Sequence, residues 1–275
     1  METKKRPKTF YTEQPRQVQD FSFPKPIVYY LAKNVNSINT YKKLIQTCKY
    51  FYSTNSVHFM PCLYFKAYEG NEWQSCSINS AKHICEKNKF NKDISPKLWI
   101  TESFRFYSNK STPKNFVSEI IPKLYRCNVS RLIISQQYLT FQEFLFLTPN
   151  VTNLHFHYVH LRYGSGKPVE FETIVSNLPK IEIFKYKFFR EDPSVSTKTA
   201  KNLLKIQHFK NPKSFSIQNL PSKFDFNLFY PFIYKNKQIK LDVTFRQPVP
   251  EKYKNSIQAY ENKTEYNTNN ASKLS

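Results

Sequence analysis

The sequence predicts an α/β protein in which a short helical hairpin is followed by an irregular solenoid of alternating strands and helices. Two observations lead to this fold class. Near the N-terminus, apolar residues recur three or four positions apart over two short segments, which is the helical period. From about residue 97 onward, strand-like segments recur every 22 to 34 residues with helix-like segments between them, which is typical of a repeat architecture.

The helical hairpin is expected to begin at Pro24 and Pro26, because the fixed φ of proline suits the first helical turn and its missing N–H costs nothing there. Residues 34–39 have the composition of a turn. Two helices this short rarely fold alone, so each is expected to pack on something larger. The apolar face comprises Ile27, Val28, Leu31 and Val35 in the first helix, Tyr41, Leu44 and Cys48 in the second, and Phe51 just beyond.

The strand-like segments share a core of two apolar residues separated by one other residue, which is the alternation of a strand with one buried face. Six such pairs follow one another along the chain. They are Leu98 and Ile100, Leu132 and Ile134, Leu154 and Phe156, Phe184 and Tyr186, Phe215 and Ile217, and Leu241 and Val243.

The segments that lead into two of these strands are also similar. Residues 147–156 and 177–186 align, with Val151 opposite Ile181 and a proline two positions before each. Together, strand, loop and helix resemble a leucine-rich-repeat-like solenoid with aromatic substitutions. The alternative is an ordinary α/β domain whose units happen to share a length. The helix-like runs lie at 116–126, 141–147, 171–178, 199–206 and 225–234.

Composition divides the chain into five parts. Residues 1–20 are polar and contain proline, so they are expected to be disordered, and the same holds for the polar tail at 251–275. Residues 21–55 are the helical module, and 97–250 are the repeat domain. Residues 56–96 are expected to form a connecting, partly helical region.

The formal charge of +22 arises from 42 Lys and Arg against 20 Asp and Glu. Such a charge attracts nucleic acid, an anionic membrane or an acidic partner. The alternative is that a compositional bias toward lysine spreads charge over every solvated face. The chain has only three glycines, which argues against a phosphate-cradling loop, because such loops need several.

The cysteines and the hydropathy of the sequence indicate in which cellular compartment we expect the chain. The five cysteines form no C-x-x-C pair, and an odd number is typical of reduced thiols. No apolar segment resembles a signal peptide, and no stretch approaches 18 apolar residues. We expect a soluble intracellular chain, cytoplasmic or nuclear, without a membrane partner.

Residues with catalytic or metal-binding chemistry are scattered. The one histidine cluster is His155, His157 and His160. On a strand, His155 and His157 share a face and could hold a metal, but no Cys, Asp or Glu stands nearby in sequence to complete a tetrahedral set. We expect a solvent-facing pair, and a protein that is not an enzyme and has no cofactor or metal.

Nucleic-acid binding is the main alternative to protein binding. Lysines interleaved with Phe and Tyr can neutralise phosphates and stack on bases. No zinc finger, RNA-recognition motif or homeodomain pattern is present, and burial in the core accounts for most of the aromatic residues. We therefore keep a basic nucleic-acid-binding or scaffold protein as the second interpretation.

Residues 23–51 resemble the F-box motif. The match runs from Phe23-Pro24 through the apolar positions of both helices to Thr47-Cys48-Lys49 and Phe51. It departs from the family pattern where Phe23 replaces leucine, Pro26 stands where an acidic residue is frequent and Phe51 replaces tryptophan; the turn also lacks the usual aspartate. The order of an F-box and leucine-rich repeats, in a chain poor in glycine, resembles the divergent F-box-like proteins of nematodes.

The resemblance implies a substrate receptor of an SCF-type cullin-RING ubiquitin ligase. The helical module would bind the Skp-type adaptor of the cullin complex, and the repeats would hold a protein substrate. The implied adaptor-binding residues are Pro24, Ile27, Val28, Leu31, Val35, Tyr41, Leu44, Cys48 and Phe51.

Alternation along the strands also predicts which side chains line the sheet face of a solenoid, where such proteins usually bind. This row is net basic, so we expect an acidic or phosphorylated partner. The row comprises Arg131, Ile133, Ser135, Asn153, His155, His157, Lys185, Lys187, Ser214, Ser216, Lys240 and Asp242.

Overall fold

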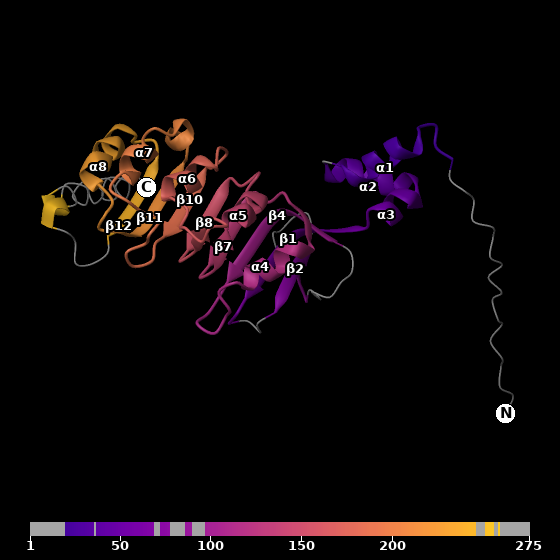
Figure 1. Ribbon diagram of the computed structural model, residues 1–275, viewed down its shortest axis with the longest axis horizontal. Helices are drawn as coiled ribbons and strands as arrows, with labels where there is room; N and C mark the ends of the chain where they lie inside the picture. Colours follow the sequence, from indigo (N-terminus) through magenta and orange to yellow (C-terminus); the bar gives the residue numbers. More distant parts are fainter. Residues whose placement is uncertain are drawn as a thin grey trace, which may run out of the picture. The chain divides into compact units, whose positions relative to one another are not determined.

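The computed structural model describes residues 20–35, 37–68, 72–77, 86–89, 97–245, 251–255 and 258 (Figure 1). The chain divides into two compact units, residues 1–56 and 57–275. The described residues form eight α-helices and a largely parallel sheet, so the predicted mixed α/β class is confirmed. The segment 1–19 and most of 256–275, both expected to be disordered, lie outside the described residues.

The smaller unit contains three helices rather than the two that the sequence predicted. They are α1 (Lys25–Lys33), α2 (Ile38–Thr47) and α3 (Lys49–Thr54). Helix α1 follows Pro24 directly, as expected. Cys48 has extended backbone and ends α2, and its Sγ accepts a hydrogen bond from the backbone N–H of Tyr50 at 3.3 Å. A new helix therefore starts there, and Phe51 lies within it.

The three short helices pack on one another around a small core of Val28, Ala32 and Phe51. The Tyr41 hydroxyl donates a hydrogen bond to the backbone carbonyl of Asn55, whose side-chain amide donates to the carbonyl of Ala32 at 3.1 Å. These two bonds tie α2 and α1 to the residue that follows α3. The unit thus has an interior of its own, which the sequence did not predict for helices of this length.

The larger unit is built on a ten-stranded sheet with the order β12-β11-β10-β8-β6-β4-β1-β2-β3, in which β5 also pairs with β4. In this order, every pair of neighbouring strands from β12 to β1 is parallel, and so is the β4–β5 pair. At the other edge, β2 pairs with β1 and β3 pairs with β2, both in antiparallel orientation. The strands are β1 (Val57–Lys66), β2 (Trp73–Ser77), β3 (Glu86–Lys89), β4 (Lys97–Tyr107), β5 (Leu124–Cys127), β6 (Arg131–Ser135), β8 (Asn153–His157), β10 (Ile183–Lys187), β11 (Ser214–Leu220) and β12 (Lys240–Phe245).

The expectation of a partly helical connection at 56–96 is wrong for the described residues of that region. They form β1, β2 and β3, all of them part of the main sheet. The run from Val57 to Lys66 contains one Val, two Phe and one Tyr, which favour strands, and it pairs in parallel with β4. Residues 78–85 and 90–96 lie outside the described part of the chain.

The predicted apolar pairs of five neighbouring strands align with one another across the sheet. The first members of the pairs form one row: Leu132, Leu154, Phe184, Phe215 and Leu241. The second members form the next: Ile134, Phe156, Tyr186, Ile217 and Val243. All are buried except Leu241, which is partly buried.

The sixth predicted pair is out of phase. Phe104, and not Leu98, is the partner of Leu132, while Leu98 pairs with Leu124 of β5. Strand β4 has 11 residues and its pairing shifts register against both β1 and β5. The bulge lets one long strand pair with two neighbours on the same edge. The spacing of the apolar pairs along the sequence does not reveal this.

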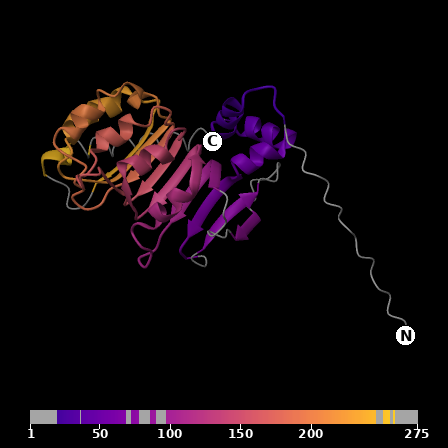
Figure 2. The same cartoon turned by 45° about the vertical axis from the view of Figure 1, so that its right-hand side comes forward.

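The helices that follow β4 in the chain overlie one face of this sheet (Figures 1 and 2). They are α4 (Phe116–Ile120), α5 (Phe141–Leu147), α6 (Phe171–Ser176), α7 (Thr199–Leu203) and α8 (Phe226–Lys235). The run predicted as one helix at 116–126 is instead α4, the 3₁₀ turn η1 (Ile121–Lys123) and β5. Helix α5 begins where expected because Thr140 and Glu143 form a reciprocal capping box.

The core lies between these helices and the apolar rows, and aromatic rings fill much of it. Phe184 stacks on Phe215 with ring centroids 4.7 Å apart. Phe171 of α6 lies edge-on to Phe184 and Tyr186, with centroids 5.9 and 5.1 Å away. Such ring pairs add to the stability that burial alone supplies.

A second, two-stranded sheet of β7 (Tyr138–Thr140) and β9 (His160–Arg162) follows β6 and β8. Gln136 and Tyr158 directly follow β6 and β8 and have positive φ. Asn219 also has positive φ, and it lies within β11, where the pairing with β12 becomes irregular. These three follow the register partners Ser135, His157 and Gln218. A non-glycine residue in this conformation costs about 1–2 kcal/mol, so surrounding contacts must hold it there.

The beginning of the predicted disordered tail is ordered. Glu251–Tyr253 form a 3₁₀ turn, η3, and the Tyr253 side chain is buried with the main core. A large aromatic ring gives this segment enough apolar area to pack, although its neighbours are polar.

We expect Phe184→Ala to lower the free energy of unfolding of the larger unit by about 3–5 kcal/mol, because it leaves a cavity in the stacked aromatic core. Both tryptophans of the chain, Trp73 and Trp99, are buried in this unit, so their fluorescence during denaturant unfolding reports on it alone.

The matched control is Lys185→Ala, the next residue on the same strand, whose exposed side chain lies on the opposite face. It should change the free energy of unfolding by less than about 0.5 kcal/mol. Equal losses from both substitutions would contradict the assignment of the two faces.

Candidate functional site

The sheet face opposite α4–α8 carries the side chains that alternate with the two apolar rows. We call it the polar face, and between β6 and β12 it comprises three rows. They are Arg131, Asn153, Ile183, Ser214 and Lys240; Ile133, His155, Lys185, Ser216 and Asp242; and Ser135, His157, Lys187 and Gln218. The residues predicted from alternation therefore lie together on one face.

Positive charge dominates the polar face. Arg131 lies on β6, Lys185 and Lys187 on β10, and Lys240 on β12. Neither Arg131 nor Lys185 forms an ion pair with another described residue. The Lys187 ammonium lies 5.3 Å from the ring centroid of Tyr158.

One carboxylate lies within these rows. It belongs to Asp242, and its oxygen accepts a hydrogen bond from the Ser216 hydroxyl at 2.8 Å. The rows between β6 and β12 thus hold four cationic side chains against one carboxylate.

The centre of the polar face holds two buried polar atoms without a hydrogen-bond partner, Nε2 of His155 and Oδ1 of Asn153. Burial lowers the pKa of His155 to about 4, with further lowering by Lys185, His157 and Arg131. The pKa of His157 is also lowered, first by burial and then by Lys187 and Lys185. Both imidazoles are therefore neutral at neutral pH, and the charge of the face comes from Arg and Lys.

Two of the predicted surface residues are not available to a partner. Ile133 is 8% exposed and Ser216 is 4% exposed. Ile133 lies between Arg105 and His155 on the adjacent strands, and the Ser216 hydroxyl is bound to Asp242. Alternation alone predicts the face on which a side chain lies but not how far its neighbours leave it exposed.

The polar face also continues onto β4 and β1, which the sequence reasoning missed. Ser103 pairs with Arg131 on one side and with Cys62 on the other, and Arg105 donates a hydrogen bond to the Ser103 hydroxyl at 2.7 Å. Burial, followed by the charge of Glu102, raises the pKa of the Cys62 thiol despite two nearby arginines. Recognising the Phe104-x-Phe106 alternation would have revealed this extension.

Metal binding finds no support on this face. Within the described ranges of the chain, no three His, Cys, Asp or Glu side chains gather closely enough to hold a metal ion. His155 and His157 are two potential ligands on one strand, surrounded by Arg131, Lys185 and Lys187. These cationic neighbours oppose binding of a cation.

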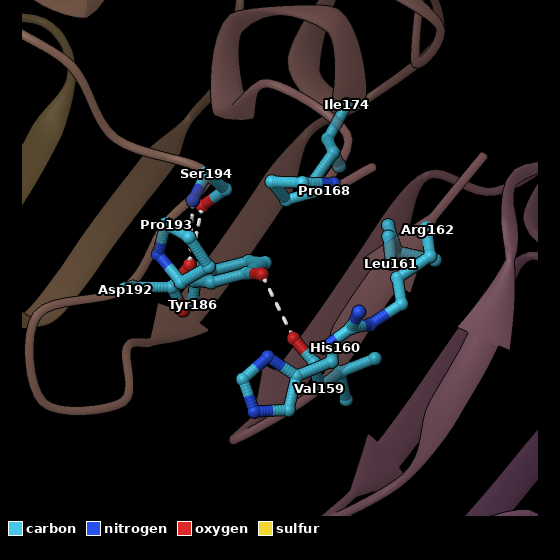
Figure 3. Close-up of a pocket in the computed structure, with 10 residues that line it drawn as sticks. All are labelled: Val159, His160, Leu161, Arg162, Pro168, Ile174, Tyr186, Asp192, Pro193 and Ser194. Carbon is cyan, nitrogen blue, oxygen red and sulfur yellow. Dashed lines mark hydrogen bonds between the residues drawn. The ribbon is translucent and has the colours of Figure 1, made fainter. Parts of the chain in front are cut away.

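A pocket of about 200 Å³ lies beside β9 in the larger unit (Figure 3). Its lining residues are Val159, His160, Leu161, Arg162, Pro168, Ile174, Tyr186, Asp192, Pro193 and Ser194. The Tyr186 hydroxyl donates a hydrogen bond to the carbonyl of Val159 at 3.1 Å. Burial raises the pKa of this hydroxyl well above its usual value.

The polar groups of this pocket mainly hold the surrounding loops. Oδ1 of Asp192 accepts hydrogen bonds from the backbone and hydroxyl of Ser194, at 3.0 and 2.7 Å. His160 stacks on Phe189 with centroids 3.7 Å apart, and burial lowers its pKa. Arg162 donates to the carbonyl of Gly166 at 3.1 Å. The pocket therefore has fewer polar groups available to contact a ligand than the polar face does.

The smaller unit presents a second surface. Ile27 and Leu31 are 47% and 45% exposed and lie one helical turn apart on α1, whereas Val28 and Ala32 point into the core. The predicted adaptor-binding residues therefore fall into three groups that differ in exposure. Pro24, Ile27 and Leu31 are exposed; Leu44 and Cys48 are partly buried; and Val28, Val35, Tyr41 and Phe51 are buried.

Comparisons of the chain with protein-family models, with curated proteins and with solved structures gave no significant match. Among the helices of the described residues, none is long and apolar enough to cross a lipid bilayer.

The lowered pKa of His155 predicts a specific pH dependence of stability. The unfolded chain protonates this histidine near pH 6.5 and the folded protein only near pH 4. The free energy of unfolding should therefore fall as the pH drops from about 6.5 to about 4, because the unfolded state binds the proton first. In His155→Gln, this fall should be smaller when tryptophan fluorescence is followed in denaturant at pH 7.5 and at pH 4.5.

The matched control is His58→Gln, which removes an exposed histidine. It should retain the fall seen in the unsubstituted protein. If both variants lose stability equally between the two pH values, burial of His155 is not a source of the pH dependence.

Proposed function

We propose that this protein is a non-catalytic receptor subunit of an SCF-type cullin-RING ubiquitin ligase. The smaller unit binds a Skp-type adaptor and the sheet of the larger unit holds a protein substrate. The observation that carries the proposal is the exposed apolar pair Ile27 and Leu31 on α1, within the segment that resembles an F-box.

The exposed side chains of the smaller unit suit a partner-binding surface. Apolar side chains gathered on one surface are costly in water and often mark an interface. Anchors one turn apart on a helix are a recurrent mode of recognition between proteins. Among the described residues of this unit, the large apolar side chains that are exposed are Phe23, Ile27, Tyr29, Tyr30, Leu31 and Tyr52.

The strand arrangement of the larger unit supports an irregular leucine-rich-repeat-like solenoid. From β4 to β12 the main strands follow one another in chain order and are parallel, and they keep one register up to Ile217, beyond which the β11–β12 pairing shifts. In solenoids of this kind each repeat contacts mainly its neighbours, and the shared sheet face forms an extended binding surface. The polar face is the equivalent surface here.

A basic nucleic-acid-binding or scaffold protein without a ligase role is the second candidate. The cations of the polar face favour it, because Arg131 and Lys185 have no ion-pair partner in the described structure. Against it, no Phe, Tyr or Trp lies in the rows between β6 and β12. Single-stranded nucleic acids bind strongly where bases stack on such rings.

We expect a double variant, Ile27→Lys and Leu31→Lys, to lose retention of a Skp-type adaptor in a pull-down with purified proteins. Two charges on the exposed apolar face would have to be buried at the interface without partners. Because both side chains are nearly half exposed in the free protein, the helical circular dichroism of the variant should be unchanged.

The matched control adds the same two charges at exposed positions of α2, as Asn39→Lys and Thr40→Lys. This variant should retain the adaptor. If the unsubstituted protein does not bind the adaptor, or if the two double variants bind equally, the proposed ligase role is wrong.

A further inference from the structure

The cations of the polar face have a regular arrangement across the sheet. They lie on β6, β10 and β12, so one strand separates each cationic strand from the next. Neighbouring strands are about 4.8 Å apart, and the cationic strands therefore recur at about 10 Å. Arg131 and Lys240 lie in the same row, and Lys185 lies between them, one row away.

This arrangement suits an anionic chain that crosses the strands. A polyproline II segment advances about 9 Å over three residues and returns to the same side at every third one. Acidic side chains three residues apart would thus meet Arg131, Lys185 and Lys240 in turn. In a fully extended β-strand, side chains on one side recur at about 7 Å, which fits the spacing less well.

We propose that the polar face binds an acidic protein segment in polyproline II conformation, with a carboxylate at every third residue, laid across β6 to β12. Lys187 adds a further cation beside Lys185, and the buried amide and imidazole of β8 lie beneath the segment. The substrate class is thus an acidic, extended peptide. The assignment of this peptide as a ligase substrate rests on the function proposed above, but its binding does not.

Three other possible occupants of the polar face are less suitable: the chain's own terminal segments, a second copy of the chain and a nucleic acid. The chain's own segments at 1–19 and 246–275 each carry more Lys and Arg than Asp and Glu, so neither is complementary to the face. A second copy of a chain with net charge +22 is repelled at long range. A nucleic acid would find phosphate contacts but no Phe, Tyr or Trp ring to stack on in these rows.

The test measures binding of fluorescent peptides to the full chain by anisotropy, at low salt where ion pairs are least screened. The first peptide is EPPEPPEPP, and EEEPPPPPP has the same composition and charge with the acidic residues adjacent. We expect the spaced peptide to bind about threefold more tightly or better, because only it can engage successive cationic strands simultaneously. KPPKPPKPP should not bind.

The decisive variant reverses two charges of the face, as Lys185→Glu and Lys187→Glu. It should weaken binding of the spaced peptide on the order of tenfold. Its matched control, Lys198→Glu and Lys201→Glu, makes the same change of net charge at exposed residues of the helix layer and should bind nearly as well as the unsubstituted protein. Tryptophan fluorescence during unfolding checks that both variants are folded.

Three outcomes would overturn the proposal: no binding of the spaced peptide, equal weakening by both charge reversals, or equal binding of the spaced and clustered peptides. Tight binding of a single-stranded RNA that the acidic peptide fails to displace, and that Lys185→Glu with Lys187→Glu abolishes, would assign the face to nucleic acid instead. None of these measurements involves the adaptor, so a failure here is separate from a failure in the pull-down.

Discussion

The larger unit depends on one constraint, the common register of its parallel strands. A shift of one residue in any strand would move its apolar pair to the polar face and its charges into the core. In β10, such a slip would place Lys185 where Phe184 stacks on Phe215, and the lysine would have no partner there. The aromatic core and the basic face are therefore two consequences of the same alignment, and neither can change independently.

This constraint explains what the sequence could predict. Five apolar pairs repeat with strict alternation, and a helical run lies between each pair and the next, so their alignment and the identity of the polar face followed from periodicity alone. Periodicity failed at β4, where a bulge lets one long strand pair with both β5 and β6. It also failed at β1 to β3, whose pairing is a long-range contact that no local pattern records.

The candidate site could be predicted only in outline. Alternation placed Lys185, Lys187 and Lys240 on the right face, because facing depends only on the parity of the position along a strand. It could not show that Ile133 is covered or that His155 has an unpartnered nitrogen, since both depend on the lengths of neighbouring side chains. In the smaller unit, period alone could not separate Ile27 from Val28, because which side of α1 faces inward depends on α3 and its Phe51.

Three of the four described non-glycine residues with positive φ set a limit on how this chain can vary. Gln136, Tyr158 and Asn219 follow register-equivalent residues and adopt a conformation that glycine adopts most easily, yet the whole chain has only three glycines. β-Branched residues are the least compatible with such positions, whatever their fit to the surrounding packing. Related chains should therefore diverge freely in the loops beyond these positions, while the positions themselves alternate among glycine, asparagine and a few unbranched residues.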